Sequence, residues 1–97
     1  MLKQINKSKM TKKEITNKCK ELRDKYMYKQ VEKEDFDWLI ENVFKFHPDW
    51  NTYFAPKYVI GMTAKHNKNN YCTKCFYLIY ADGTQEDISW NKSIENK

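Results

Sequence analysis

The chain has 97 residues, of which 40% are hydrophobic and 32% are charged, with a formal net charge of +5. This length suits one domain with a modest core, and two glycines and two prolines argue against a disordered or low-complexity chain. No apolar run is long enough for a membrane span, and no apolar signal-peptide core precedes the domain. We therefore expect a cytoplasmic protein whose three cysteines are reduced thiols.

The positive charge is concentrated in the first third of the chain. Residues 1–30 carry ten Lys/Arg and three Asp/Glu (net +7), residues 31–49 carry two and six (net −4), and residues 50–97 carry six and four (net +2). Residues 1–10 are polar and show no periodicity, so we expect a basic flexible arm there and a single domain over 11–97. A basic arm favours anionic partners through counterion release, and a solvated lysine-rich helix face is the alternative.

Two helices are predicted in the first half. Thr11 and Glu14 have the spacing of a capping box, and apolar residues at helical spacing predict an amphipathic helix over about 11–28. A second helix begins in an acidic stretch and should stop near Phe46, because Pro48 disfavours helical geometry before it. Its apolar face is formed by Phe36, Leu39, Ile40, Val43 and Phe44.

The second half is predicted to form a sheet. A loop at 49–56 should be pinned to the core by the rings of Trp50, Tyr53 and Phe54. Strands are predicted at 57–63, 74–80 and 84–88, with residues 64–73 as a polar loop between the first two.

The chain reversal between the last two strands carries a turn signal. Asp82 and Gly83 indicate a two-residue type I′ turn that pairs Ala81 with Thr84. The same register places Tyr77 opposite Ile88.

Ser89 is expected to cap a final helix over 90–95. The predicted fold is α+β, with two N-terminal helices packed on a three-stranded antiparallel meander and a short C-terminal helix.

The cysteines and histidines include one candidate set of metal ligands. Cys72 and Cys75, together with His66 or His47, could supply four zinc ligands. A structural zinc site usually needs a second closely spaced pair, and residues three apart on a strand point to opposite faces. We therefore expect no metal and no cofactor, with the cysteines as core or surface thiols.

No catalytic constellation is indicated. His47 could serve as a general acid or base, but a histidine at a helix end more often bonds a terminal carbonyl and packs beside an aromatic ring. Asp82 suits a turn, whereas Glu86 and Asp87 should point to opposite faces of a strand. A Gly-rich phosphate loop and a nucleophile elbow are both lacking, so we expect no enzymatic activity and no catalytic residues.

A series of short motifs runs through the chain in a characteristic order. A helix ends at a His-Pro step, an aromatic strand opens with Lys-Cys, and an Asp-Gly-Thr turn precedes an Asp-x-Ser segment. Over about 11–94 this order resembles the DCL-like family, named for the plant "defective chloroplasts and leaves" protein. Lys74 stands where that family has arginine, and Ile88 where it has an aromatic residue. The matching residues are His47, Pro48, Cys75, Phe76, Asp82, Gly83, Thr84, Asp87 and Ser89. Helix termination and turn geometry alone can explain His47-Pro48 and Asp82-Gly83-Thr84.

The resemblance implies a connection with RNA. Plant members of the DCL-like family are linked to plastid ribosomal RNA processing, and a similar domain ends a plant-specific RNA polymerase large subunit. In this chain the segment 64–74 combines cations, amide donors and an aromatic ring, which suit phosphates and unstacked bases. The predicted nucleic-acid-binding residues are Lys57, Lys65, His66, Lys68, Asn70, Tyr71 and Lys74.

Two hypotheses for function follow. The first is a small non-enzymatic module that binds nucleic acid, RNA in preference to DNA. The alternative is a phage-type protein that binds and inhibits a host protein or defence enzyme. Its contact surface would be the acidic helix over 32–41 together with Trp38, Trp50 and Trp90, which are expected to be exposed. A solvated polar loop is the plain alternative for 64–74.

Overall fold

The computed structural model describes residues 10–96, so most of the expected arm over 1–10 lies outside the described residues. The helices are α2 (Lys12–Lys25), α3 (Lys33–Asn42) and α4 (Trp90–Glu95); the strands are β1 (Val59–Asn67), β2 (Asn70–Tyr80) and β3 (Gln85–Ile88). Short helical turns η1 (Phe44–Phe46), η2 (Trp50–Phe54) and η3 (Ala55–Lys57) connect α3 to β1.

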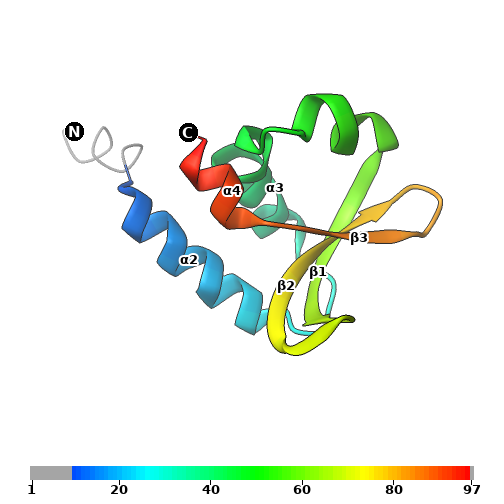
Figure 1. Ribbon diagram of the computed structural model, residues 1–97, viewed down its shortest axis with the longest axis horizontal. Coiled ribbons are helices and arrows are strands. Elements are labelled where there is room, and N and C mark those ends of the chain that lie inside the picture. Colours follow the sequence, from blue (N-terminus) through cyan, green and yellow to red (C-terminus); the bar gives the residue numbers. More distant parts are fainter. Residues whose placement is uncertain (1–9, 97) are drawn as a thin grey trace.

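The strands form one antiparallel sheet in the order β1-β2-β3, and the three helices lie to one side of it (Figure 1). The predicted α+β fold is thereby confirmed. No helix within residues 10–96 has the length and apolar content to cross a membrane.

The first helix begins as predicted. The Thr11 hydroxyl accepts a hydrogen bond from the Glu14 N–H (3.1 Å), and the Glu14 carboxylate accepts one from the Thr11 N–H (2.9 Å). This capping box satisfies two of the N–H groups that a helix start leaves unpaired.

Helix α2 ends earlier than the predicted residue 28. The segment after it leaves the helix and runs along the free edge of β1, where the Tyr28 N–H bonds to the Ala64 carbonyl oxygen (2.6 Å). Three residues on, the Val31 N–H bonds to the Met62 carbonyl oxygen (2.8 Å). After α2, these long-range hydrogen bonds to β1 take the place of helical hydrogen bonds. The spacing of apolar residues in the sequence does not indicate such long-range bonds.

The predicted polar loop over 64–73 is wrong, because those residues extend both strands to a two-residue turn. The ladder pairs His66 with Lys74 but Asn67 with Asn70, so residues 71–73 of β2 form a bulge. Ladder hydrogen bonds satisfy the backbone of any sequence, so a polar composition did not prevent this hairpin from forming.

The turn between β2 and β3 is one residue longer than predicted. The Gly83 N–H bonds to the Tyr80 carbonyl oxygen (2.9 Å), and the Tyr80 N–H bonds to the Thr84 carbonyl oxygen (2.9 Å). The loop therefore holds three residues, with Gly83 in the left-handed region at φ +90°.

The longer turn changes the register of β3. Phe76 pairs with Ile88 and Tyr77 pairs with Asp87, so the predicted pairing of Tyr77 with Ile88 is wrong. Because neighbouring residues of a strand face opposite ways, this one-residue shift places Ile88 on the inner face beside Phe76.

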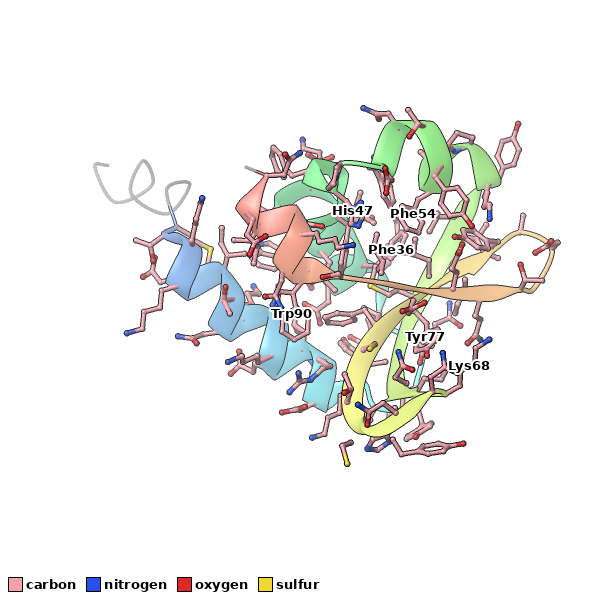
Figure 2. All side chains as sticks on the ribbon, in the orientation of Figure 1. Phe36, His47, Phe54, Lys68, Tyr77 and Trp90 are labelled. Atoms are coloured by element: carbon pink, nitrogen blue, oxygen red, sulfur yellow. The ribbon has the colours of Figure 1, made fainter. Side chains whose placement is uncertain are left out.

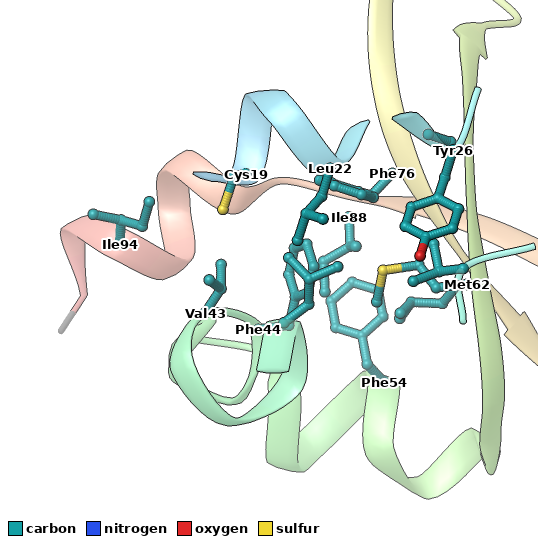
Figure 3. Close-up of a cluster of buried hydrophobic side chains, with 14 of the residues drawn as sticks. Cys19, Leu22, Tyr26, Val43, Phe44, Phe54, Met62, Phe76, Ile88 and Ile94 are labelled. Atoms are coloured by element: carbon teal, nitrogen blue, oxygen red, sulfur yellow. The ribbon is translucent and has the colours of Figure 1, made fainter. Parts of the chain in front are cut away.

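The core lies between the inner face of the sheet and the helices (Figure 3). The rings of Phe44 and Phe76 meet edge to face, with centroids 5.7 Å apart. The loop predicted at 49–56 is instead a π-helical turn followed by a 3₁₀ turn, from which Phe54 enters the core while Tyr53 stays exposed. Other buried side chains include Ile15, Cys19, Leu22, Leu39, Val43, Met62, Leu78 and Ile94.

Helix α4 begins where Ser89 predicted. Its hydroxyl accepts a hydrogen bond from the Lys92 N–H (3.3 Å), which caps the helix. The chain turns away from the sheet at this point, so β3 ends opposite Phe76 and the outer part of β2 has no neighbour on that side.

Candidate nucleic-acid interface

The structure does not bring Lys57 to the other predicted binding residues. It lies in η3, before β1, whereas the others lie toward the β1–β2 turn at the far end of that strand. Its Nζ is 3.4 Å from Glu86 Oε1 and 4.0 Å from the centre of the Tyr53 ring. Lys57 therefore belongs to a separate cluster at the β2–β3 end of the molecule.

Lys65 lies on the outer face of the sheet, away from the helices. Its Nζ donates to Gln85 Oε1 (2.7 Å) and lies 4.6 Å from the centre of the Tyr77 ring. Tyr77 is only 6% exposed, and burial raises the pKa of its hydroxyl. The Lys65 side chain thus covers the Tyr77 ring on the outer face of the sheet.

The tip of the β1–β2 hairpin curls over the same ring. Lys68 at this tip lies beside Tyr77 in Figure 2, and its backbone partly opposes the rise in the pKa of the Tyr77 hydroxyl. Asn70 Oδ1 accepts a hydrogen bond from the Cys72 N–H (3.1 Å), so this amide shapes the bulge. Beside it the Tyr71 side chain is 75% exposed.

His66 and Lys74 are cross-strand neighbours, and each contacts the C-terminal end of α2 or the residues after it. The Tyr28 hydroxyl lies 2.6 Å from His66 Nδ1, and the two rings are 5.7 Å apart. Lys74 Nζ lies 3.4 Å from Asp24 Oδ1. Asp24 Oδ1 is in turn 3.1 Å from Arg23 Nε.

The row of contacts continues from Arg23 to Trp90. The guanidinium lies 5.3 Å from the centre of the Trp90 ring, which meets Phe76 edge to face on the core side. We call this connected set, Tyr28, His66, Lys74, Asp24, Arg23 and Trp90, the hairpin face.

A groove of about 450 Å³ opens beside the hairpin face, between the end of α2, the bulge of β2 and the start of α4. Its volume is within the range of small-ligand sites. Three of its residues, Cys75, Asp87 and Ser89, belong to the motif series found in the sequence. The groove is lined by Arg23, Cys72, Thr73, Lys74, Cys75, Asp87, Ile88, Ser89, Trp90 and Asn91.

The electrostatics of the groove favour anions on one wall. Hydrogen bonding to Arg23, together with the nearby charge of Lys74, holds the pKa of the Asp24 carboxyl below its usual range. Asp24 is therefore ionised at neutral pH and neutralises part of the charge of its two neighbours.

Among the described residues, Trp90 Nε1 is a buried nitrogen without a hydrogen-bond partner.

The remaining motif residues lie away from the groove. The His47 ring is 7% exposed, packs edge to face on Phe54 (5.1 Å) and accepts a hydrogen bond at Nδ1 from the Asp49 N–H (3.0 Å). This packing matches the sequence expectation, but the ring bonds an N–H and not the expected terminal carbonyl. Pro48 follows it at the surface.

The turn motif has a compact hydrogen-bond pattern. Asp82 Oδ1 accepts from both the N–H (3.0 Å) and the hydroxyl (2.6 Å) of Thr84, which brackets Gly83. The Thr84 hydrogen bonds also hold the pKa of the Asp82 carboxyl below its usual range.

The cysteines and histidines do not form a metal site in the described structure. Within residues 10–96, no three His, Cys, Asp or Glu side chains are close enough to hold an ion. Cys19 is fully buried, Cys75 is half-buried and Cys72 is exposed, and all three are free of disulfides.

A second hollow, of about 470 Å³, lies between α3, η2 and the start of β1. It is mainly apolar, formed by Phe36, Ile40, Trp50 and Val59, with Asp37 and Glu41 at its rim.

The expectation of exposed tryptophans is wrong. Trp38, Trp50 and Trp90 are all half-buried, with their rings packed against the core.

Sequence reasoning found His66 and Lys74 of the hairpin face, named Trp90 only as a contact for a partner protein, and missed Tyr28, Asp24 and Arg23. The helix terminus that brings these three to the hairpin depends on pairing with β1, which has no local signal. The Asp-x-Ser-Trp order was available as a pointer to the groove, because it places Asp87 and Trp90 close to the end of β3.

A compact α+β domain with an open polar hairpin and an adjoining groove is the class of protein that these observations define. Residues 20–94 match a family described as "Protein of unknown function (DUF3223)", and the chain belongs to this family. The whole hairpin face lies inside the matched range.

A solved structure is also similar to this chain. The solution NMR structure of an uncharacterised protein from Rhodospirillum rubrum shares 26% sequence identity, with a TM-score of 0.70 over 86% of this chain and 77% of that one. A comparison with curated proteins found no match.

Proposed function

We propose that this protein is a non-enzymatic module that binds nucleic acid, with RNA preferred over DNA. The observation that carries the proposal is the hairpin face, where an exposed tyrosine, a histidine and two cationic side chains are joined along one open surface. Aromatic rings beside cations are the usual means of binding unpaired nucleotides.

The aromatic part of the surface is open to solvent. The Tyr28 side chain is 63% exposed although it contacts His66, and Tyr71 is exposed at the hairpin tip. Each ring can stack on an unpaired base, which stabilises single-stranded RNA binding by about 1–3 kcal/mol per base.

The backbone at Tyr28 supports a role for this ring. Tyr28 has φ +60°, in the left-handed region that non-glycine residues rarely adopt. Such strain persists only where surrounding contacts impose it, and it is concentrated at functional sites. Here the bonds to Ala64 and His66 hold the ring outward.

The positive charge of α2 adds a contribution to nucleic-acid affinity that does not depend on base sequence. Lysines on the exposed side of α2 extend the positive field of Arg23 and Lys74 toward the N-terminal end, where the sequence is most basic. Such a field raises association rates and nonspecific affinity for phosphate backbones. The motif order that resembles the DCL-like family, with its link to RNA processing, supports the same proposal.

Fluorescence anisotropy with labelled single-stranded RNA, double-stranded RNA and single-stranded DNA, measured across a salt series, tests the proposal. The variant Lys68→Gln/Lys74→Gln should lose most of the affinity and reduce the salt slope by about 2, since two phosphate contacts are removed.

Lys33→Gln/Lys45→Gln is the matched control, because it removes the same charge from the surface near α3. Equal losses in both variants, or no salt-dependent binding by the wild type, would refute binding at the hairpin face.

A second candidate function, binding to a partner protein as an inhibitor, is favoured by the apolar hollow beside α3. Its acidic rim at Asp37 and Glu41 suits a partner segment that carries apolar and basic side chains. A specific partner that the wild type captures, and that the Ile40→Glu variant does not, would support this function; capture by both would exclude the hollow.

A further inference from the structure

We propose that Arg23 and Lys74 form a clamp for one phosphate group, and that Asp24 occupies the phosphate position when no ligand is bound. This inference rests on the proposed RNA-binding function and specifies where the RNA backbone enters the groove.

The geometry around Asp24 carries the inference. A single oxygen, Oδ1, lies 3.1 Å from Arg23 Nε and 3.4 Å from Lys74 Nζ. The two cations come from different elements, α2 and β2, and converge on one point. A phosphate oxygen placed there would receive the same two charge-assisted hydrogen bonds.

Helix geometry alone does not explain why Arg23 and Asp24 pair. Adjacent residues on a helix project in different directions and do not normally face each other. Here Asp24 contacts Lys74 on the neighbouring hairpin, and Arg23 contacts Asp24 while it lies over the Trp90 ring. The pairing is therefore a property of the groove entrance.

The difference in solvent exposure between the Arg23 and Asp24 side chains allows a phosphate to replace the Asp24 carboxylate. The Arg23 side chain is 18% exposed and is held against the Trp90 ring, whereas that of Asp24 is 53% exposed. The cation is thus preorganised and the carboxylate is free to swing into solvent. Exposed ion pairs contribute little stability, so a phosphate can displace Asp24 at small cost.

The groove behind the clamp can take the attached nucleoside. Trp90 lines this groove together with the polar residues Asp87, Ser89 and Asn91. The bulge of β2 borders the same space, so an unpaired nucleotide reaches it from the hairpin tip without crossing the core.

The test compares Asp24→Asn with Glu21→Gln, which removes one negative charge from the same helix at another exposed position. Asp24→Asn should raise the affinity for single-stranded RNA about fivefold at low salt, because a competing anion about 4 Å from the phosphate is neutralised. Glu21→Gln should raise it less than twofold. Arg23→Gln should lower it, with thermal unfolding showing that each variant is folded.

A second measurement separates the clamp from the RNA proposal. The Arg23 Nε–Hε resonance is followed by NMR during titration with inorganic phosphate, in the wild type and in Asp24→Asn. A shift that saturates at lower phosphate concentration in Asp24→Asn supports the clamp, even if RNA does not bind. RNA binding with equal gains in Asp24→Asn and Glu21→Gln, or the absence of any phosphate-induced shift, overturns it.

Discussion

The Tyr80 hydroxyl donates a 2.6 Å hydrogen bond to Oε1 of Glu86, which joins β2 to β3 near their turn. The same carboxylate accepts a hydrogen bond from the Tyr53 hydroxyl (2.7 Å) and lies 3.4 Å from Lys57 Nζ. Burial alone would raise the pKa of Glu86, but the hydrogen bonds from Tyr80, Tyr53 and Lys57 outweigh it and lower the pKa. One carboxylate thus ties the turns before β1 to the sheet.

Replacement of Glu86 by Gln should destabilise the fold. The neutral amide has one acceptor oxygen in place of two, so a donor that bonds one of the Glu86 oxygens would face an NH2 group, and we expect the free energy of unfolding to fall by about 1–3 kcal/mol. Urea unfolding followed by tryptophan fluorescence measures this change. Glu95→Gln, at an exposed position of α4, should have no measurable effect; an equal loss in both variants would contradict a specific role of Glu86.

Acid should weaken the fold through His47. Burial lowers the pKa of this ring, and its Nδ1 must stay unprotonated to accept the Asp49 N–H. The unfolded chain takes up a proton near pH 6.5, whereas the folded chain resists it, so the unfolded state binds more protons. The free energy of unfolding should therefore be constant above pH 7.5 and should fall as the pH drops through 6.5 toward the lower folded pKa.

Thermal unfolding between pH 8 and pH 5 checks this dependence. His47→Gln should flatten the part of the curve below pH 6.5. A full decrease that persists in His47→Gln would assign the pH dependence to another group.

The left-handed tyrosines give a paired test of strain and binding. Tyr58 has φ +61° and Tyr28 has φ +60°, so glycine at either position relieves backbone strain, by up to about 1 kcal/mol at the more exposed Tyr58. Tyr58→Gly should keep its RNA affinity, whereas Tyr28→Gly should lose a stacking platform and bind at least fivefold more weakly. Anisotropy and urea unfolding measure the two effects; equal RNA affinity in both variants would remove Tyr28 from the binding surface.

Gly83 should tolerate substitution poorly for a purely conformational reason. Apart from Gly83 itself and its two chain neighbours, no atom of the described residues lies within 4 Å of the position that a Cβ would take, but the residue has φ +90°. Gly83→Ala should cost about 1 kcal/mol of unfolding free energy, and Gly83→Asn should cost less, because Asn tolerates this region better. Equal stability of the wild type and Gly83→Ala would show that the turn rearranges.

The parts of the fold with local signals were predictable. The capping box at Thr11 and the Ser89 cap each depend on residues within one turn of each other. The end of the second helix was predicted less well, because α3 ends at Asn42 and a separate 3₁₀ turn, Phe44–Phe46, leads to the His-Pro step. The full length of the β1–β2 hairpin was not predictable from local signals, because its polar outer half is held by backbone pairing and by contacts such as that of Lys65 with the Tyr77 ring. Hydrophobic patterning carries little information about such strands.

The candidate site shows the same division. His66 and Lys74 could be proposed from composition, because both belong to a basic, amide-rich segment. Arg23 and Asp24 looked like ordinary members of a lysine-rich helix, and their convergence on Lys74 depends on where α2 ends relative to β1. The register error at Tyr77 arose from a turn one residue longer than Asp82-Gly83 suggested.

The bulge at residues 71–73 divides β2 into a part that packs in the core and a part that forms the hairpin tip. On the C-terminal side of the bulge, the buried side chains of Phe76 and Leu78 fix the register of β2 against β1. On its N-terminal side, pairing with β1 resumes only at Asn70. Insertions or deletions within 71–73 would therefore change the reach and shape of the hairpin tip without moving a single core side chain. A change of length in this segment of a relative with the same scaffold would thus alter the hairpin tip while the fold is inherited unchanged.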